Sequence, residues 1–149
     1  MIAKQLYSSP LGNMLVECDG AALTALRFVP DAEAAGSSTI PAPIRRWLDC
    51  YFAGGQPVFT PPLKMQGTAF QQRVWSELLA IPYGRTTTYG ELARRIGCRS
   101  AQAVGQAVGR NPIAVVVPCH RVVGADGTLT GYAYGLELKR RLLELESGN

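Results

Sequence analysis

The stretch Val115–Val123, Val-Val-Val-Pro-Cys-His-Arg-Val-Val, constrains the fold of this chain more than any other. Its β-branched residues favour extended backbone that packs well in an interior. The stretch therefore predicts a short run that delivers Cys119 to a buried turn. His120, the only histidine of the chain, follows at once.

The Cys119–His120 pair allows two interpretations. A cysteine is a poor nucleophile until its thiol ionises, which a free cysteine does only near pH ~8.5. An adjacent imidazole that takes the proton makes it a useful nucleophile. The alternative is a core cysteine beside a hydrogen-bonded histidine, because buried thiols commonly behave as small hydrophobic groups. The pair alone favours the alternative, and the flanking residues reverse that preference.

Charge is unevenly placed along the 149 residues. Residues 1–63 carry a net charge of −1 and residues 64–149 a net charge of +5, so a polyanion should meet the second part. Ordinary surface charge that serves solubility is the alternative. A hydrophobic content of 47% supports a real core, in one domain or in two small ones.

Four cysteines are spread along the chain without close-paired spacing: Cys18, Cys50, Cys98 and Cys119. With a single histidine, they predict neither a zinc site nor another metal site. The N-terminal residues do not resemble a signal peptide, and no apolar run approaches the length of about 18 residues that a membrane span needs. Free thiols without an export signal predict a protein of the reducing cytoplasm with no membrane partner.

Residues 1–62 indicate a support domain. Short apolar runs between turn residues predict three strands in a small antiparallel sheet. The range 29–43 is rich in Pro, Ala, Gly and Ser and predicts a loop, whose order is left open. Apolar residues at helical spacing then predict a helix. The expected strands are Ile2–Tyr7, Asn13–Cys18 and Leu23–Phe28, and the expected helix is Ile44–Phe52.

Residues 63–149 indicate a second, mainly helical domain. Thr88 with Glu91 three residues later fits a capping box at the start of a short helix. That helix is expected to stop at Gly97, and Ser100 is the expected N-cap of the next helix, after a tight turn at Cys98-Arg99. Two such helices form a helix-turn-helix pattern, although a plain αα-hairpin in a core gives the same pattern. The expected helices are Thr68–Ile81, Thr88–Ile96, Ala101–Arg110 and Glu137–Glu146. The last is expected to face the core through Leu138, Leu142, Leu143 and Leu145.

The helix over Ala101–Arg110 is slim, since small residues occupy its alternate positions. Glycine inside a helix costs up to ~1 kcal/mol relative to alanine, so Gly105 and Gly109 indicate close approach to another surface. That surface is either a DNA minor groove, only ~6 Å wide, or the Val115–Val117 run. The sequence leaves both alternatives open.

Two segments flank the Cys-His pair. Asn111 ends the slim helix on the segment that leads to Cys119, where its ordinary role is a hydrogen bond to local backbone. Beyond the pair, the range Leu129–Gly135 is a glycine-rich loop with two tyrosines, Tyr132 and Tyr134. That loop predicts the wall of a pocket.

In this context, Pro118-Cys119-His120-Arg121-Val122 resembles the active-site motif of the O6-alkylguanine-DNA alkyltransferases, the methylated-DNA–protein-cysteine methyltransferases. The resemblance is strong over residues 67–147 and looser over the N-terminal sheet. It implies a mixed α/β (α+β) fold, with a ribonuclease-H-like support domain over residues 1–62 and a DNA-binding transfer domain over residues 63–149. Further segments follow the family pattern in order: Thr68–Tyr89, Ala103–Gly105, Asn111-Pro112 and Gly131–Leu143.

The resemblance implies DNA repair by irreversible, stoichiometric transfer of the alkyl group of O6-alkylguanine to Cys119. O4-alkylthymine is left open as a second substrate. Family members bind duplex DNA through a helix-turn-helix in the minor groove and flip the damaged base into a pocket. No metal or organic cofactor is implied, and the human-type zinc site lacks its histidines here. The expected protein is a monomer, with clustering on DNA left open.

The resemblance also assigns roles to individual residues. Cys119 is the expected acceptor, and His120 is expected to draw its proton through a water. Glu146 matches the carboxylate that orients this histidine, and Asn111 matches the asparagine that braces the turn. Tyr89 matches the tyrosine near the flipped guanine and the adjacent phosphate.

Main-chain groups share the expected recognition of guanine. The carbonyl groups of Cys119 and Val122 would accept from the guanine amine, and the N–H of Ala133 would face O6. Because these contacts use backbone atoms, side-chain identity matters less at these positions. Tyr132, on the same loop as Ala133, is also expected beside the substrate.

The chain departs from the family at Gln102. Family members carry an arginine at this position, and its side chain fills the space in the base stack that the flipped base vacates. A glutamine side chain can insert into the base stack and form hydrogen bonds, but it carries no charge and no guanidinium that stacks on the bases. Arg99 or Arg110 could contact the DNA phosphates instead, or simply be surface charges. Arg121 and Ser100 complete the residues expected against substrate or DNA.

Two other functions are weighed against repair. Alkyltransferase-like damage sensors bind the lesion without transfer, but they lack the cysteine that this chain has at position 119. A weakened or regulatory DNA-binding protein is the other alternative, and Gln102 is the feature that favours it.

Overall fold

The computed structural model describes residues 2–30 and 39–148. The chain forms two compact units, one built from residues up to Met65 together with Pro112–Ala114. The other is built from Gln66–Asn111 and Val115–Ser147. Of the predicted loop over residues 29–43, residues 31–38 lie outside the described residues.

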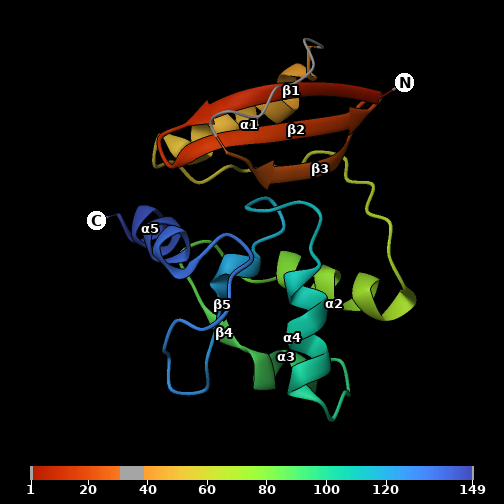
Figure 1. Ribbon diagram of the computed structural model, residues 1–149, viewed down its shortest axis with the longest axis vertical. Helices are drawn as coiled ribbons and strands as arrows, with labels where there is room; N and C mark the ends of the chain where they lie inside the picture. Colours follow the sequence, from red (N-terminus) through yellow and green to blue (C-terminus); the bar gives the residue numbers. More distant parts are fainter. Residues whose placement is uncertain (1, 31–38, 149) are drawn as a thin grey trace. The chain divides into compact units, whose positions relative to one another are not determined.

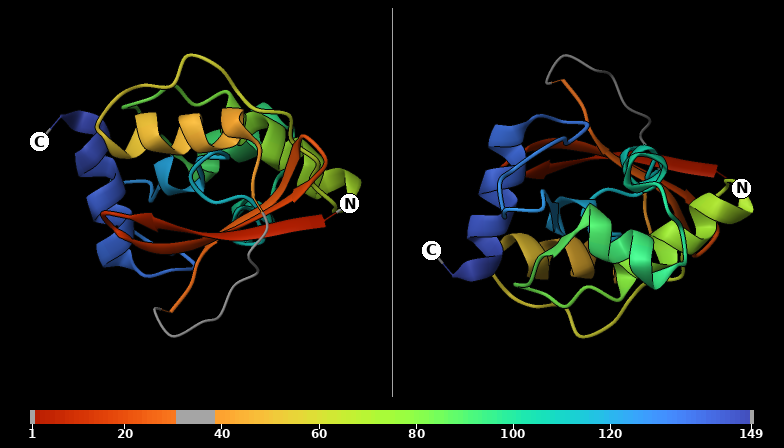
Figure 2. Two further views of the ribbon diagram at one scale, coloured as in Figure 1. Left: turned by 90° about the horizontal axis from the view of Figure 1, so that it is seen from above. Right: turned by 90° about the horizontal axis from the view of Figure 1, so that it is seen from below.

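The first unit is a three-stranded antiparallel sheet with one helix along a face (Figure 1, Figure 2). The strand order is β1-β2-β3, and Gly20 makes the second hairpin turn at a positive φ of 61°. These elements confirm the small antiparallel sheet and the helix that the sequence predicts. Their bounds are β1 Ile2–Ser9, β2 Gly12–Asp19, β3 Ala22–Phe28 and α1 Ala42–Phe52.

The helix α1 packs on the sheet through an apolar stripe that includes Trp47 and Phe52. The Tyr7 ring lies 6.0 Å from the Phe52 ring, and the Tyr7 hydroxyl donates to the Asp49 carboxylate at 2.7 Å. This face is the core of the unit, as the helical spacing of its apolar residues predicts.

A short segment from far along the chain extends the edge of this sheet. The Leu26 N–H donates to the Pro112 carbonyl at 3.0 Å, and the Ala114 N–H donates to the Leu26 carbonyl at 2.8 Å. Elsewhere on β3, the Leu23 N–H donates to the Pro62 carbonyl at 2.8 Å. Because an unpaired strand edge invites pairing with other chains, these segments protect β3.

The second unit is mainly helical and contains the helix-turn-helix pair α3 and α4 (Figure 1). The predicted helices are confirmed, with ends that differ by a few residues. A two-residue parallel pairing joins β4, Thr87–Thr88, to β5, Val122–Val123. The helices are α2 Ala69–Leu79, α3 Tyr89–Arg95, α4 Ala101–Gly109 and α5 Leu136–Ser147.

The predicted capping box of α3 is present only in its first half. The Thr88 hydroxyl accepts the Glu91 N–H at 3.1 Å, as expected of an N-cap. The Glu91 side chain instead pairs with Arg94 and Arg95 on its own helix.

Among the described residues, no helix has the length and apolar character needed to cross a membrane.

Candidate active site

The chain enters the site through a strained residue. Val115 has a φ of 70°, a left-handed conformation that β-branched residues rarely adopt. The expectation of extended backbone over Val115–Val117 is therefore wrong, because the chain turns there. The chain then turns into a single turn of 3-10 helix, η1, at Cys119–Arg121, where the Arg121 N–H donates to the Pro118 carbonyl at 3.0 Å. Only 8% of Cys119 is exposed and His120 is fully buried, which confirms the predicted buried turn.

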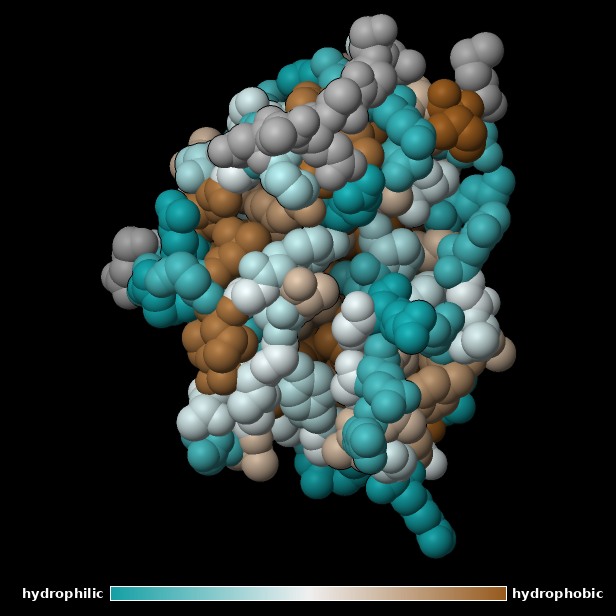
Figure 3. Space-filling model, viewed as in Figure 1, coloured by the Kyte–Doolittle hydropathy of each residue, from teal (hydrophilic) through white to brown (hydrophobic). Residues whose placement is uncertain are grey.

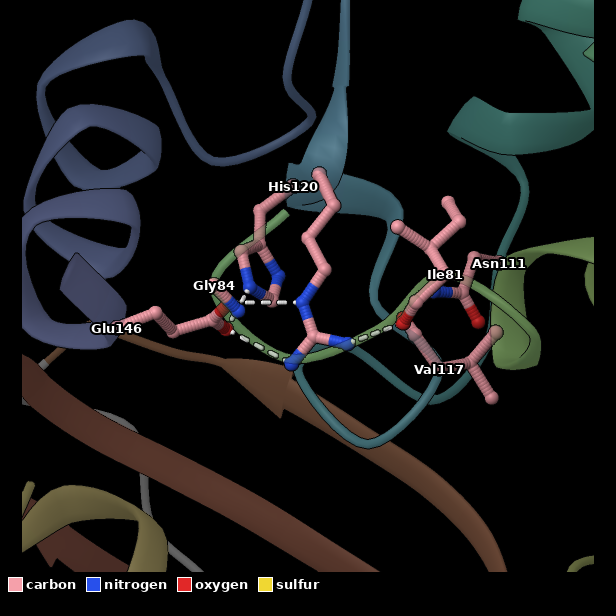
Figure 4. A network of polar contacts seen from close by, with 7 residues as sticks. Ile81, Gly84, Asn111, Val117, His120 and Glu146 are labelled. Carbon is pink, nitrogen blue, oxygen red and sulfur yellow. Dashed lines mark hydrogen bonds and ion pairs between the residues drawn. The ribbon is translucent and has the colours of Figure 1, made fainter. Parts of the chain in front are cut away.

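A buried polar network lies directly behind this turn (Figure 4). His120 Nε2 lies 2.5 Å from Glu146 Oε2. The Arg121 guanidinium donates to both oxygens of the same carboxylate, at 2.7 and 3.0 Å, and to the Ile81 carbonyl at 2.8 Å. The Gly84 N–H donates to Glu146 Oε1 at 3.1 Å. The carboxylate is therefore held from three directions.

The network fixes the charge state of Glu146. Burial by itself raises the pKa of this carboxyl, but the hydrogen bonds and charges of His120 and Arg121 outweigh it and lower the pKa to about 2. Burial also lowers the pKa of His120, with Glu146 opposing the shift. An ionised Glu146 requires His120 Nε2 to be the protonated nitrogen, which leaves Nδ1 with the lone pair.

Asn111 lies on the other side of the turn. Its Nδ2 donates to the Val117 carbonyl at 2.8 Å, two residues before Cys119 (Figure 4). Burial raises the pKa of the Cys119 thiol, while the Asn111 side chain and the charge of Lys139 oppose the rise. At neutral pH, Cys119 is therefore a thiol that needs help to ionise.

Cys119 opens into a cavity of about 140 Å³, here called the Cys119 cavity. In the space-filling view, this unit shows a hollow beside α4 with apolar atoms at its floor (Figure 3). The Tyr89 hydroxyl at its rim donates to the Thr130 carbonyl at 3.2 Å. The walls of the Cys119 cavity include Asn111, Tyr89, the α4 residues Gly105 and Gly109, and the loop over residues 131–134.

The tyrosines of that loop form one wall, as the sequence predicts. The Tyr132 and Tyr134 rings meet edge to face, with centroids 5.5 Å apart. Burial raises the pKa of Tyr132 well above its usual range, so its hydroxyl stays protonated at neutral pH. Within the described part of the chain, that buried hydroxyl has no hydrogen-bond partner.

Among the described residues, close packing does not explain the slim helix. A Cβ added at Gly109 would meet nothing within 4 Å, and one added at Gly105 would lie 3.7 Å from the Tyr89 ring. Neither glycine contacts the Val115–Val117 run closely, so that run is not what requires them. Close approach of α4 to a DNA minor groove stays a prediction.

Four other residues expected against DNA or substrate do not line the Cys119 cavity: Gln102, Arg110, Ser100 and Arg121. Gln102 lines a shallow groove with Tyr89, and Arg110 lines a separate one beside α2. The Ser100 hydroxyl caps α4 by accepting the Ala103 N–H at 3.0 Å. Arg121 is committed to the Glu146 network. The DNA or substrate contacts expected of these residues, of Val122 in β5 and of Ala133 stay predictions.

Sequence reasoning missed Lys139. The sequence predicts a core face made by Leu138, Leu142, Leu143 and Leu145 of the last helix, yet the buried residues of α5 are Lys139, Leu142 and Glu146. Lys139, Leu142 and Glu146 are three and four residues apart, a spacing that places them on one face of the helix and could have indicated their burial. It was hidden because two of the three residues are charged.

The described residues contain no cluster of His, Cys, Asp or Glu that could hold a metal ion.

Two family models match nearly the whole chain. Residues 69–148 match the model for the 6-O-methylguanine DNA methyltransferase DNA binding domain, and residues 2–65 match the model for its ribonuclease-like domain. A methylated-DNA–protein-cysteine methyltransferase of Mycobacterium tuberculosis is 47% identical, with 98% of this chain and 93% of the relative covered. One of Methanosarcina acetivorans is 45% identical, with 95% and 96% covered.

A solved structure shows the same fold. The crystal structure of Mycobacterium tuberculosis OGT in complex with DNA aligns with a TM-score of 0.87 and 45% sequence identity. The alignment covers 97% of this chain and 92% of that chain. Similarity of this extent over both units confirms the mixed α/β fold class expected from the sequence.

Proposed function

The chain belongs to the 6-O-methylguanine DNA methyltransferase family, and from that premise we propose how its residues carry out the activity. The protein binds DNA and repairs it by alkyl transfer, as a methylated-DNA–protein-cysteine methyltransferase. Cys119 is the acceptor of the alkyl group from O6-alkylguanine. The observation that carries this proposal is the His120–Glu146 pair, at 2.5 Å, directly behind the cysteine that opens into the cavity.

The first step is the ionisation of Cys119. The buried thiol has a raised pKa, so a base must take its proton. Nδ1 of His120 accepts that proton, through a water, because Nε2 is committed to Glu146. The imidazolium that forms is stabilised by the ionised Glu146 carboxylate, which Arg121 holds in place.

The second step is the transfer itself. The thiolate of Cys119 attacks the alkyl carbon, a sulfur–carbon bond forms, and the bond between that carbon and O6 breaks. The electron pair of the broken bond stays on the purine, which then takes up one proton. The thioether product has no good leaving group, so each protein molecule acts once. Neither metal nor organic cofactor takes part in these steps.

The helix-turn-helix pair supplies the DNA surface. We place α4 in the minor groove, because a Cβ added at the exposed Gly109 would meet nothing within 4 Å among the described residues. The extruded base enters the Cys119 cavity, with Tyr89 at its rim, and the backbone of Ala133 and Val122 is expected to form hydrogen bonds with it. The uncharged side chain of Gln102 fills the space that the extruded base leaves in the stack. The proposed active form is a monomer.

We also propose where the protein acts and how its parts divide the work. A reaction that consumes a free thiol requires a reducing compartment, and we therefore propose the cytoplasm. None of the described residues of the N-terminal unit lines the Cys119 cavity, so the proposed role of that unit is support.

One experiment separates transfer from damage sensing. The protein is incubated with a duplex that contains one O6-methylguanine, and its intact mass and DNA binding are then measured. We expect a gain of one methyl group per protein molecule. Unchanged mass with retained binding of the lesion would favour the sensor and contradict the proposal. The Cys119→Ala variant should bind the same duplex without gaining mass.

A further inference from the structure

Lys139 is a buried cation that the steps above do not use. None of its surface is exposed, which is rare for lysine. Its Nζ donates to the Thr130 carbonyl at 2.9 Å and to the Gly131 carbonyl at 3.1 Å. It also lies 6.0 Å from the centroid of the Tyr89 ring. Because burying an ammonium is costly without compensation, its presence beside the site needs a reason.

The fixed charges nearby do not balance Lys139. In residues 2–30 and 39–148, no carboxylate forms an ion pair with its ammonium. The Glu146 carboxylate is engaged by Arg121 and His120. Two carbonyl dipoles and an aromatic ring face offset the Lys139 charge only in part. The group that can offset it fully is an anion that forms during the reaction.

Cys119 is the source of such an anion. The charge of Lys139 acts to lower the pKa of the Cys119 thiol, and a Cys119 thiolate acts to raise the pKa of Lys139, while burial opposes both effects. The other titratable groups that face Cys119 are His120 on its own turn, Tyr89 from α3 and Tyr132 from the cavity loop. Burial raises the pKa of both tyrosines, so they are neutral phenols at pH 7.

We propose that Lys139 is a positioning residue of the transfer reaction, whose ammonium is the counter-charge of the Cys119 thiolate and whose two hydrogen bonds hold the loop that lines the cavity. The inference rests on the proposed function, since it takes Cys119 as the acceptor. Thr130 links both roles, because its carbonyl accepts from Lys139 and from the Tyr89 hydroxyl. Transfer replaces the thiolate by a neutral thioether, which removes the anion that balances the Lys139 ammonium.

The test measures the ionisation of Cys119 in the whole protein without DNA. Iodoacetamide modification of Cys119 is followed by peptide mass between pH 5 and pH 10. Lys139→Gln keeps an amide donor for the two carbonyls but removes the charge. We expect the apparent pKa of Cys119 to rise by about one unit in this variant, with modification about tenfold slower at pH 7.

Two variants complete the comparison. Lys139→Arg restores the charge and should return the profile toward that of the original protein. Arg141→Gln removes an exposed charge two residues along α5 and should leave the profile unchanged. If Lys139→Gln has the thermal stability and the Cys119 profile of the unaltered protein, Lys139 is no counter-charge and the proposal is overturned. A lower thermal stability with an unchanged profile reduces its role to holding the loop, which also overturns it.

A second measurement avoids substitution altogether. The pKa of Lys139 is followed by NMR in the free protein and in the protein whose Cys119 carries a carbamidomethyl group. Since coupling between two titrating groups is reciprocal, losing the thiolate should lower the pKa of Lys139. An unchanged value would contradict the proposal even if the Lys139 variants fail to fold. Neither the iodoacetamide profile nor the NMR titration uses a methylated base, so both can fail or succeed independently of methyl transfer.

Discussion

The His120 ring and the Glu146 carboxylate, 26 residues apart in the chain, meet at 2.5 Å in a fully buried pair. The pair sets both the tautomer of the imidazole and the direction of the lone pair that can reach the Cys119 proton. A carboxylate in this position stabilises the imidazolium without itself becoming protonated.

The first prediction concerns the stability that this pair provides. Glu146→Gln leaves Arg121 as a buried charge without its partner, and breaking a buried ion pair typically costs about 3–5 kcal/mol. We expect a loss of about that size in the free energy of unfolding, measured by urea denaturation at pH 7. Glu144→Gln is the matched control, because Glu144 is exposed on the same helix and its pair with Arg140 contributes at most about 1 kcal/mol. Equal losses in the two variants would show that the Glu146 network is not stabilising.

The second prediction is a pH profile for methyl transfer. Burial lowers the pKa of His120 below its ordinary value of about 6.5, so His120 remains a neutral base below that pH. The single-turnover rate should therefore stay level from about pH 8 to pH 6.5 and fall only at lower pH. In His120→Gln, the rate should instead rise up to and beyond pH 9, because burial raises the pKa of the unassisted Cys119 thiol above 9.0. The same profile in both proteins would exclude His120 as the base.

The third prediction tests the departure at position 102. Gln102→Arg restores a cation at the position proposed to enter the stack, so both the affinity for the lesion duplex and the transfer rate should rise. Each added phosphate contact should steepen the salt dependence of binding by about 0.9 in log–log slope. Gln106→Arg, in the same groove, is the control for charge alone. If the transfer rate changes equally in both variants, Gln102 has no special place in the stack.

The fourth prediction concerns the slim helix. Gly109→Ala adds a methyl group that meets nothing within 4 Å among the described residues, and alanine is favoured over glycine inside a helix by up to ~1 kcal/mol. The variant should be more stable to thermal unfolding, yet bind the lesion duplex more weakly, because the added methyl group stands where the groove must approach. Unchanged DNA affinity in the more stable variant would argue against close approach of α4 at this position.

The sequence predicts the local elements well, because periodic apolar residues and caps such as Thr88 and Ser100 act over a few residues. It predicts less where a segment depends on distant partners. Pro112–Ala114 joins the sheet edge at β3, although a helix end and a proline give no sign of strand pairing. Only the folded chain brings Leu26 to this segment.

The last helix shows the same limit at the site. Taken from the residues alone, Glu146 resembles an exposed charge, and only the family resemblance indicates that it orients His120. Lys139 has no such indication. Its burial depends on the carbonyl groups of Thr130 and Gly131, which the chain brings together by a loop that periodicity does not describe.

The central claim is that the thiol of Cys119, among four cysteines, accepts the alkyl group. The most direct measurement is tandem mass spectrometry of peptides after reaction with a limiting, then an excess, amount of O6-methylguanine duplex. The account predicts one methyl group per protein molecule, located on Cys119, with Cys18, Cys50 and Cys98 unmodified at every ratio. A methyl group on any other residue, or more than one per molecule, would contradict it.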